Sequence, residues 1–169
     1  AAAHNLNRQQ PRVRLFETGL RFVPDEELSQ TPMLALLLCG RRMPESWSSS
    51  AESVDFFDMK GEIEALLQAA DQTLTFRPAV RPGLHDGQTA EILLGDEVAG
   101  VMGRIHPRAA RQMNLPEQTL VAELTLASTV SRVLPDYQDI SKFPEVRRDI
   151  AVLVSRDIPS AAVVDCARL

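Results

Sequence analysis

Aromatic side chains are scarce in this sequence. Of its 169 residues 44% are hydrophobic, but only 5% are Phe, Trp or Tyr. Aliphatic side chains and alanine must therefore fill most of any core. With 24% charged residues the composition is ordinary for a globular protein. The length suits one domain, or one domain and part of another.

A basic excess is also missing, because the formal net charge is −5. Proteins that bind nucleic acids on their own usually carry positive charge, since the neutralisation of phosphates dominates their affinity. The acidic balance argues against a free-standing nucleic-acid binder. Any RNA contact would have to come from a local basic patch or from another part of a larger assembly.

Cysteines and long apolar runs are few. Cys39 and Cys166 have no metal-ligand spacing and lie in the apolar contexts LLLCG and VVDCARL. We predict that both are buried free thiols in a reducing cytoplasm. No apolar run approaches the ~20 residues of a membrane helix, and the polar residues 1–12 contain no signal-peptide core. We expect this stretch to be the end of a helix that starts upstream and stops at Pro11.

Hydrophobic patterning predicts an α+β protein with a mainly antiparallel sheet, because strands mostly follow strands. Near-alternation predicts a strand over residues 12–23 with a bulge at Gly19. After an acidic loop, a continuous apolar run predicts its hairpin partner at 33–40. Further strands are expected at 74–80, at 119–127 and as a tight hairpin within 90–107, with a turn-rich loop at 81–89.

One long helix is expected at residues 54–70, where apolar residues recur every three or four positions. Asp55 and Asp58 enrich its start, which suits the helix dipole. Gly61 is a local cost and a candidate for close packing. Short helices are expected at 107–115, opened by proline at its first turn, and at 128–136.

A second domain is expected to begin after Pro135. An aromatic-Pro pair leads into a predicted strand within 140–154, and a helix is expected after 158. This part has only ~30 residues, below the ~40 at which a domain usually needs extra support. We therefore predict a boundary at residue 135 and a second domain that is truncated.

Five segments in this order resemble the C-terminal part of the bacterial phenylalanyl-tRNA synthetase beta subunit. The resemblance spans residues 6–169 and is specific because D-F-x-D-x-K-G and F-P-x-x-R-R-D occur together. Asp86, in GLHDG, stands where the family usually has proline. The segments are VRLFETGLRF, ESVDFFDMKGEIEALL, GLHDGQTAEILLGDEVAGVMGRIHP, LVAELTL and SKFPEVRRDIAVLV.

The resemblance implies an architecture. Residues 1–135 would be a class II aminoacyl-tRNA synthetase catalytic-like module, an antiparallel sheet flanked by helices that has lost catalysis. Residues 136–169 would start a ferredoxin-like anticodon-binding domain, in which Lys142, Arg147 and Arg148 are the implied RNA contacts. In the family an alpha subunit carries the active site of this cytoplasmic ligase. Two alpha and two beta subunits form a heterotetramer that joins phenylalanine to its tRNA with ATP and magnesium.

The residues themselves do not predict adenylate chemistry in this chain. Class II synthetases hold ATP with an Arg-Glu strand pair, because arginine makes planar bidentate phosphate contacts. RLFE supplies Arg14 and Glu17, but their spacing puts them on opposite faces of a strand. No later glycine-rich segment ends in arginine, and Arg104 is the nearest approach. We expect no catalytic or cofactor-binding residue here, with Arg12 and Arg14 solvated or paired with neighbouring acids.

Other groups of polar residues are better explained by structural roles than by a catalytic or metal site. His85, Asp86 and His106 would suffice for a three-ligand metal site, but no short spacing links them, so we predict turn or hydrogen-bonding roles and no metal. Two alternatives stay open: a stand-alone RNA-binding or regulatory protein, and a small metal hydrolase using His85 and His106. The acidic residues near the long helix are expected to form a solvated face; they are Asp55, Asp58, Glu62 and Glu64.

Overall fold

The chain forms two compact units in the computed structural model, Ala1–Pro135 and Asp136–Leu169. The structure describes residues 1–23, 29–48, 50–68, 73–130, 137, 139, 142–144 and 146–167. Part of the short helix predicted at 128–136 and part of the strand predicted within 140–154 lie outside the described residues.

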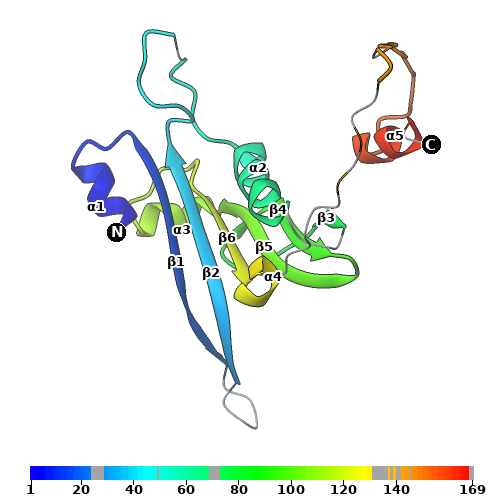
Figure 1. The fold of residues 1–169 in the computed structure, drawn as a ribbon. Coiled ribbons are helices and arrows are strands. Elements are labelled where there is room, and N and C mark those ends of the chain that lie inside the picture. Colours follow the sequence, from blue (N-terminus) through cyan, green and yellow to red (C-terminus); the bar gives the residue numbers. More distant parts are fainter. Residues whose placement is uncertain are drawn as a thin grey trace. The chain divides into compact units, whose positions relative to one another are not determined.

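The first unit is built on one six-stranded antiparallel sheet with the order β1-β2-β6-β5-β4-β3 (Figure 1). This confirms the expected α+β class and the antiparallel pairing. The strands are β1 (Arg12–Val23), β2 (Ser29–Gly40), β3 (Leu74–Pro78), β4 (Leu84–Leu94), β5 (Glu97–Ile105) and β6 (Leu120–Thr125). Because β6 inserts between β2 and β5, the last strand joins the β1–β2 hairpin to the β3–β5 meander.

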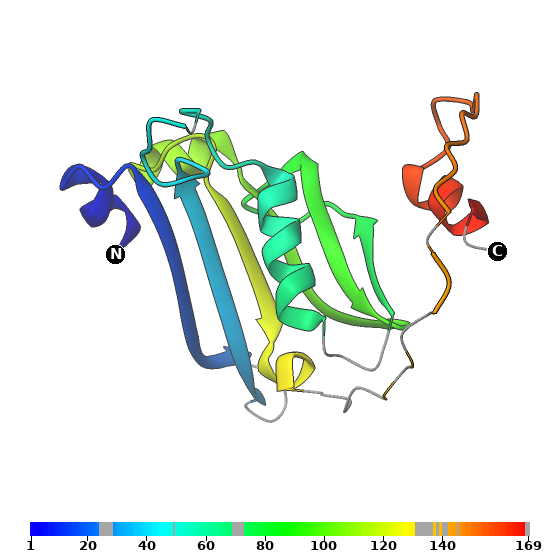
Figure 2. The ribbon, with the colours of Figure 1, turned by 45° about the horizontal axis from the view of Figure 1, so that its top comes forward.

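Helix α2 lies across one face of this sheet, as both ribbon views show (Figures 1 and 2). The helices of the first unit are α1 (Ala2–Asn7), α2 (Phe56–Leu67), α3 (Pro107–Gln112) and α4 (Leu126–Val130). Each falls within or beside a predicted helix. Among the described residues, no helix is long and apolar enough to cross a membrane.

The main core lies between α2 and the sheet. Met59, Ile63 and Leu67 recur every four residues along α2 and are buried. They pack on large side chains that the sheet buries, among them Leu38, Ile92, Met102, Leu120 and Leu124. Burial of each such side chain stabilises the fold by roughly 1.5–3 kcal/mol. An aliphatic core is what the scarcity of aromatic residues requires.

The start of α2 is fixed by a capping box. The Asp55 carboxylate accepts hydrogen bonds from the backbone N–H groups of Phe57 at 2.9 Å and Asp58 at 3.0 Å. In return, Oδ2 of Asp58 accepts from the Asp55 N–H at 2.7 Å. Both carboxylates satisfy donors that a helix start leaves unpaired, so the helix begins at Phe56 and not at residue 54.

Three expectations about strands and glycines were wrong. Gly19 forms no bulge, because it pairs directly with Met33 in a continuous register. The strands β2 and β4 begin earlier than predicted, so residues 29–32 are paired with β1 and residues 84–89 belong to β4, with an irregular register between Leu84 and Thr89. Gly61 makes no close approach, since an added Cβ there would meet nothing within 4 Å.

In the second unit the strand predicted near residues 150–154 does not form, and the described residues 146–155 contain no strand. Ile150 and Leu153 are 81% and 103% exposed. A strand needs a neighbour for its hydrogen bonds, and no described segment supplies one here. The expected helix is present as α5 (Ser160–Ala167) and buries none of its residues.

One of the two cysteines is not buried as expected. Cys39 is buried and free, whereas Cys166 is free but exposed. Burial raises the pKa of the Cys39 thiol, although a hydrogen bond with Thr119 offsets part of the effect.

Candidate binding groove on the open face of the sheet

The face of the sheet opposite α2 carries one rung that crosses all six strands. Its pairs are Glu17–Ala35, Ala35–Glu123, Glu123–Val101, Val101–Glu91 and Glu91–Arg77. Directly paired residues project from the same face. Three carboxylates, from β1, β6 and β4, therefore lie in line across the open face.

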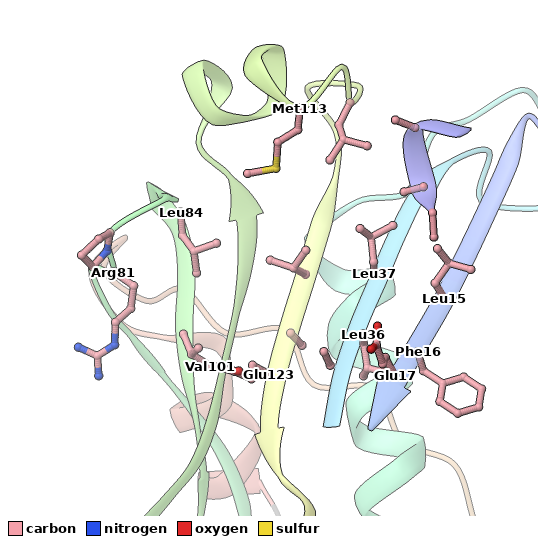
Figure 3. Close-up of a pocket in the computed structure, with 18 residues that line it drawn as sticks. Leu15, Phe16, Glu17, Leu36, Leu37, Arg81, Leu84, Val101, Met113 and Glu123 are labelled. Atoms are coloured by element: carbon pink, nitrogen blue, oxygen red, sulfur yellow. The ribbon is translucent and has the colours of Figure 1, made fainter. Parts of the chain in front are cut away.

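The neighbouring rung is apolar and consists of Leu15, Leu37 and Val121. It forms the floor of a groove of about 810 Å³. Figure 3 shows Leu15 and Leu37 on adjacent strands, with Met113 and Leu84 across the groove. Near α1 the groove adjoins a small apolar cluster that consists of Ala2, Leu6, Val13, Leu15, Leu37, Cys39 and Leu115.

Glu91 is neutralised by two arginines. Nη2 of Arg77 lies 2.6 Å from its Oε2, and Arg81 pairs with its Oε1. The Glu91 side chain is only 12% exposed. The hydrogen bond from Arg77, followed by the charges of Arg77 and Arg81, lowers the pKa of Glu91 against the opposing effect of burial. This part of the rung is a fixed ionic structure.

The other two carboxylates are less constrained. Oε2 of Glu123 lies 3.6 Å from Nη1 of Arg21, and both side chains are about half exposed. Glu17 is exposed and has no ion pair among the described residues. The groove thus combines an apolar floor with an unneutralised carboxylate at the β1 edge.

The groove is suited to binding. The described residues that line it include no Ser, Thr, Cys, His or Lys, so this lining offers no pair of nucleophile and base. An apolar segment with a cationic group fits its floor and its free carboxylate. Sequence reasoning missed the groove because it depends on the register of six strands.

The predicted Arg-Glu strand pair is split between the faces of the sheet. Arg14 pairs with Glu62 of α2, and its Nη2 donates to the carbonyl oxygen of Arg42 at 3.3 Å. Nε of Arg12 donates to the same oxygen at 3.3 Å. The expectation that Arg14 pairs with a neighbouring acid is confirmed.

The nearest later arginine is also engaged. Nε of Arg104 donates to the carbonyl oxygen of Glu117 at 2.8 Å, and its Nη2 lies 3.6 Å from Oε2 of the same residue. Its guanidinium thus connects β5 to Glu117 in the segment before β6.

The acidic residues around α2 are not a purely solvated face, which corrects the expectation. Arg42 makes ion pairs with Glu52 at 3.1 Å, Asp55 at 2.7 Å and Asp58 at 3.0 Å. The hydrogen bond with Asp58, and then the surrounding negative charge, raises the pKa of Arg42. Glu62 is taken up by Arg14. These contacts tie the connector after β2 to the start of α2.

Both histidines of the conceivable metal site have hydrogen-bonding roles, as predicted. Nδ1 of His85 accepts from the N–H of Gly87 at 3.1 Å, and Nδ1 of His106 accepts from the N–H of Arg108 at 3.2 Å. His106 thereby caps α3. Within the part of the chain that the structure describes, no group of three or more His, Cys, Asp or Glu residues is placed to hold a metal ion.

The predicted RNA contacts lie in the second unit. Lys142, Arg147 and Arg148 are all exposed. They stay predictions, since none of their contacts identifies a nucleic-acid site.

The chain forms an α+β domain with an apolar groove on its open face, and the family comparison gives its class. The family described as Phenylalanyl tRNA synthetase beta chain CLM domain matches residues 1–126. The chain therefore belongs to the phenylalanyl-tRNA synthetase beta chain family.

Relatives extend the similarity over both units. The Phenylalanine–tRNA ligase beta subunit of Pseudomonas syringae pv. tomato is 47% identical over 171 residues, covering 99% of this chain and 22% of the relative. The subunit of Hahella chejuensis is 45% identical, covering 96% of this chain and 21% of the relative. That of Photorhabdus laumondii is 47% identical, with 92% and 20% covered. The chain spans about a fifth of the length of these relatives.

Proposed function

We propose that this chain is a non-catalytic scaffold and subunit-interface part of a cytoplasmic phenylalanine–tRNA ligase. The ligase would join phenylalanine to its tRNA with ATP and magnesium, with the chemistry in an alpha subunit and an assembly of two alpha and two beta subunits. The observation that carries the proposal is the groove, whose lining offers an apolar floor and no nucleophile. Arg14 forms an ion pair with Glu62, and this pairing supports the absence of an ATP site.

The two units take different parts in this proposal. Residues 1–135 act as a class II synthetase-like module, which their antiparallel sheet under α2 supports. Residues 136–169 belong to a ferredoxin-fold anticodon-binding domain. Their uncovered apolar side chains, such as Ile150 and Leu153, support a domain that is completed by further strands. Lys142, Arg147 and Arg148 contact the tRNA.

The alpha subunit occupies the groove in this proposal. The apolar rung of Leu15, Leu37 and Val121 gives it a surface to bury, and Glu17 gives it a charge to neutralise. Ala35 is exposed and lies between Glu17 and Glu123 in the rung. A large side chain at this position fills the groove without removing any core contact.

The test is to mix the purified chain with the cognate alpha subunit and to measure the mass of the complex by light scattering on a sizing column. We expect a complex with the wild-type chain and with Thr75→Trp, an exposed β3 position outside the groove lining. Ala35→Trp should abolish it. Equal binding by both variants would place the interface elsewhere, and pyrophosphate exchange by the chain alone would refute the non-catalytic role.

A further inference from the structure

Strand β1 forms one edge of the sheet, and among the described strands it pairs only with β2 (Figure 1). It is 12 residues long. A long edge strand presents a row of unpaired backbone donors and acceptors, which is a template for another strand.

The hydrogen-bond pattern shows which residues present that edge. The N–H of Arg41 donates to the carbonyl oxygen of Pro11 at 2.7 Å, and this bond continues the β1–β2 register. Because hydrogen-bonded and non-hydrogen-bonded pairs alternate in an antiparallel ladder, the odd-numbered residues of β1 bond to β2. The even-numbered residues direct their N–H and carbonyl groups outward.

The same even-numbered residues carry apolar side chains that the sheet leaves uncovered. Phe16 is 77% exposed, Leu20 is 51% exposed and Phe22 is 56% exposed. The row projects from the same face of the sheet as Arg14, which pairs with Glu62 of α2, whereas Leu15 and Glu17 project from the open face. Phe16 and Glu17 also line the groove (Figure 3), so the edge adjoins the surface assigned to the alpha subunit above.

We propose that β1 pairs antiparallel with β1 of a second copy of this chain, about a twofold axis at Gly19. Outward-facing residues pair with outward-facing residues in this register, so Phe16 meets Phe22 of the second copy and Thr18 meets Leu20. Glu17 then lies opposite Arg21 of the second copy, and each of these contacts occurs twice. The two six-stranded sheets become continuous.

Neighbouring registers that preserve the hydrogen bonds are less complementary. An axis at Glu17 sets this carboxylate against its own copy, which is repulsive. An axis at Thr18 places Glu17 opposite Gly19 and Arg21 opposite Leu15, so neither charge gains a partner. Of these three axes, only the one at Gly19 sets Glu17 opposite Arg21 and Phe16 opposite Phe22. This match is the reason for proposing a second copy of the chain as the partner of the edge.

Disulfide trapping tests the register directly. At the proposed axis the two Gly19 residues form a non-hydrogen-bonded pair with Cα atoms ~4.5 Å apart, within the range that a disulfide spans. An added Cβ at Gly19 meets nothing within 4 Å. The variant is Gly19→Cys with Cys166→Ser, because Cys166 is exposed while Cys39 is buried. Oxidised glutathione serves as the electron acceptor.

The matched control is Gly61→Cys in the same background, since a Cβ at Gly61 also meets nothing within 4 Å. We expect Gly19→Cys to form a covalent dimer at least about ten times faster than Gly61→Cys. Equal rates would overturn the proposal.

Charge reversal gives an independent readout by sedimentation equilibrium of the chain without the alpha subunit. Glu17→Arg should raise the dimer dissociation constant by about ten-fold, because two attractive pairs become repulsive. Adding Arg21→Glu should recover part of the lost affinity, because opposite charges face each other again across the axis while the ion pair of Arg21 with Glu123 of its own chain is lost. Circular dichroism checks that each variant is folded. A wild-type chain that stays monomeric at every concentration, or a double variant without recovery, would overturn the pairing. The alpha subunit is absent from this measurement, so neither result tests its binding to the groove, although Glu17 lines both surfaces.

Discussion

Arg42 and Asp58 meet at the start of α2, where Nε of the guanidinium lies 3.0 Å from Oδ2 of the carboxylate. The same oxygen accepts a hydrogen bond from the N–H of Asp55 at 2.7 Å. Asp58 thus joins the connector after β2 to the first turn of the helix that covers the core. The capping box of α2 and the ion pairs of Arg42 therefore share the carboxylate of Asp58.

Removal of the cap residue is the first prediction. Asp55→Ala loses the acceptor for two helix N–H groups and the 2.7 Å pair with Arg42. We expect the free energy of unfolding, measured with urea, to fall by about 1–2 kcal/mol. Asp55→Asn is the control, because it keeps an oxygen for the cap but not the charge. It should fall between the alanine variant and the wild type, and an unchanged alanine variant would contradict the structure.

Local chemistry explains why this region could be anticipated only in part. Asp55 and Asp58 at the start of an apolar period are a local signal, so the helix was predictable, although it begins at Phe56 and not at residue 54. Their partner Arg42 lies beyond a polar connector, and no local rule selects it. A solvated face was therefore the natural but wrong expectation.

Strands show the same division between local and distant information. Alternation predicted β1, but the extension of β2 back to Ser29 follows from its 12-residue partner. The apolar residues 150–154 carry a strong strand pattern, yet no neighbour pairs with them among the described residues. The groove depends on six strands in register, which periodicity within single segments does not contain.

Glycine substitutions test the packing of the sheet. At Gly100 an added Cβ would lie 2.2 Å from the carbonyl oxygen of Glu123 and 2.9 Å from Cα of Leu124. These are backbone atoms of the neighbouring strand β6, which cannot move without breaking the ladder. Gly100→Ala should therefore lower the free energy of unfolding by about 1–3 kcal/mol or more.

The control for that variant is Gly61→Ala, where an added Cβ meets nothing within 4 Å. It lies inside α2 and should raise the free energy of unfolding by roughly 0.5–1 kcal/mol, because alanine favours the helix. Thermal or urea denaturation of both variants checks the opposite signs. Loss of stability in both would contradict the difference in packing.

The ion pairs of Glu91 predict a dependence of stability on pH. Its pKa in the folded chain is lowered from the ordinary value of 4.5. A carboxylate with a lowered folded pKa contributes stability that is complete above the unfolded pKa and is lost as pH falls through the folded pKa. Urea unfolding between neutral pH and acid should show a decline below about pH 4.5 that is shallower in Glu91→Gln. The control is Glu97→Gln, an exposed position with no ion pair among the described residues. Parallel curves for the wild type and Glu91→Gln would contradict this prediction.

The basic residues of the second unit give a prediction about salt. If Arg148 contacts a tRNA phosphate, its neutralisation removes one counterion-releasing contact. The slope of log affinity against log salt should then become shallower by about 0.7–0.9 in Arg148→Gln, and binding should weaken. Lys142→Gln and Arg147→Gln should act in the same direction. Arg108→Gln is the matched control, an exposed arginine of the first unit that carries the same charge. Binding of the cognate tRNA is measured by fluorescence anisotropy over a salt series. A loss of affinity with no change in slope would contradict a phosphate contact, since that contact and the released counterions cannot be separated.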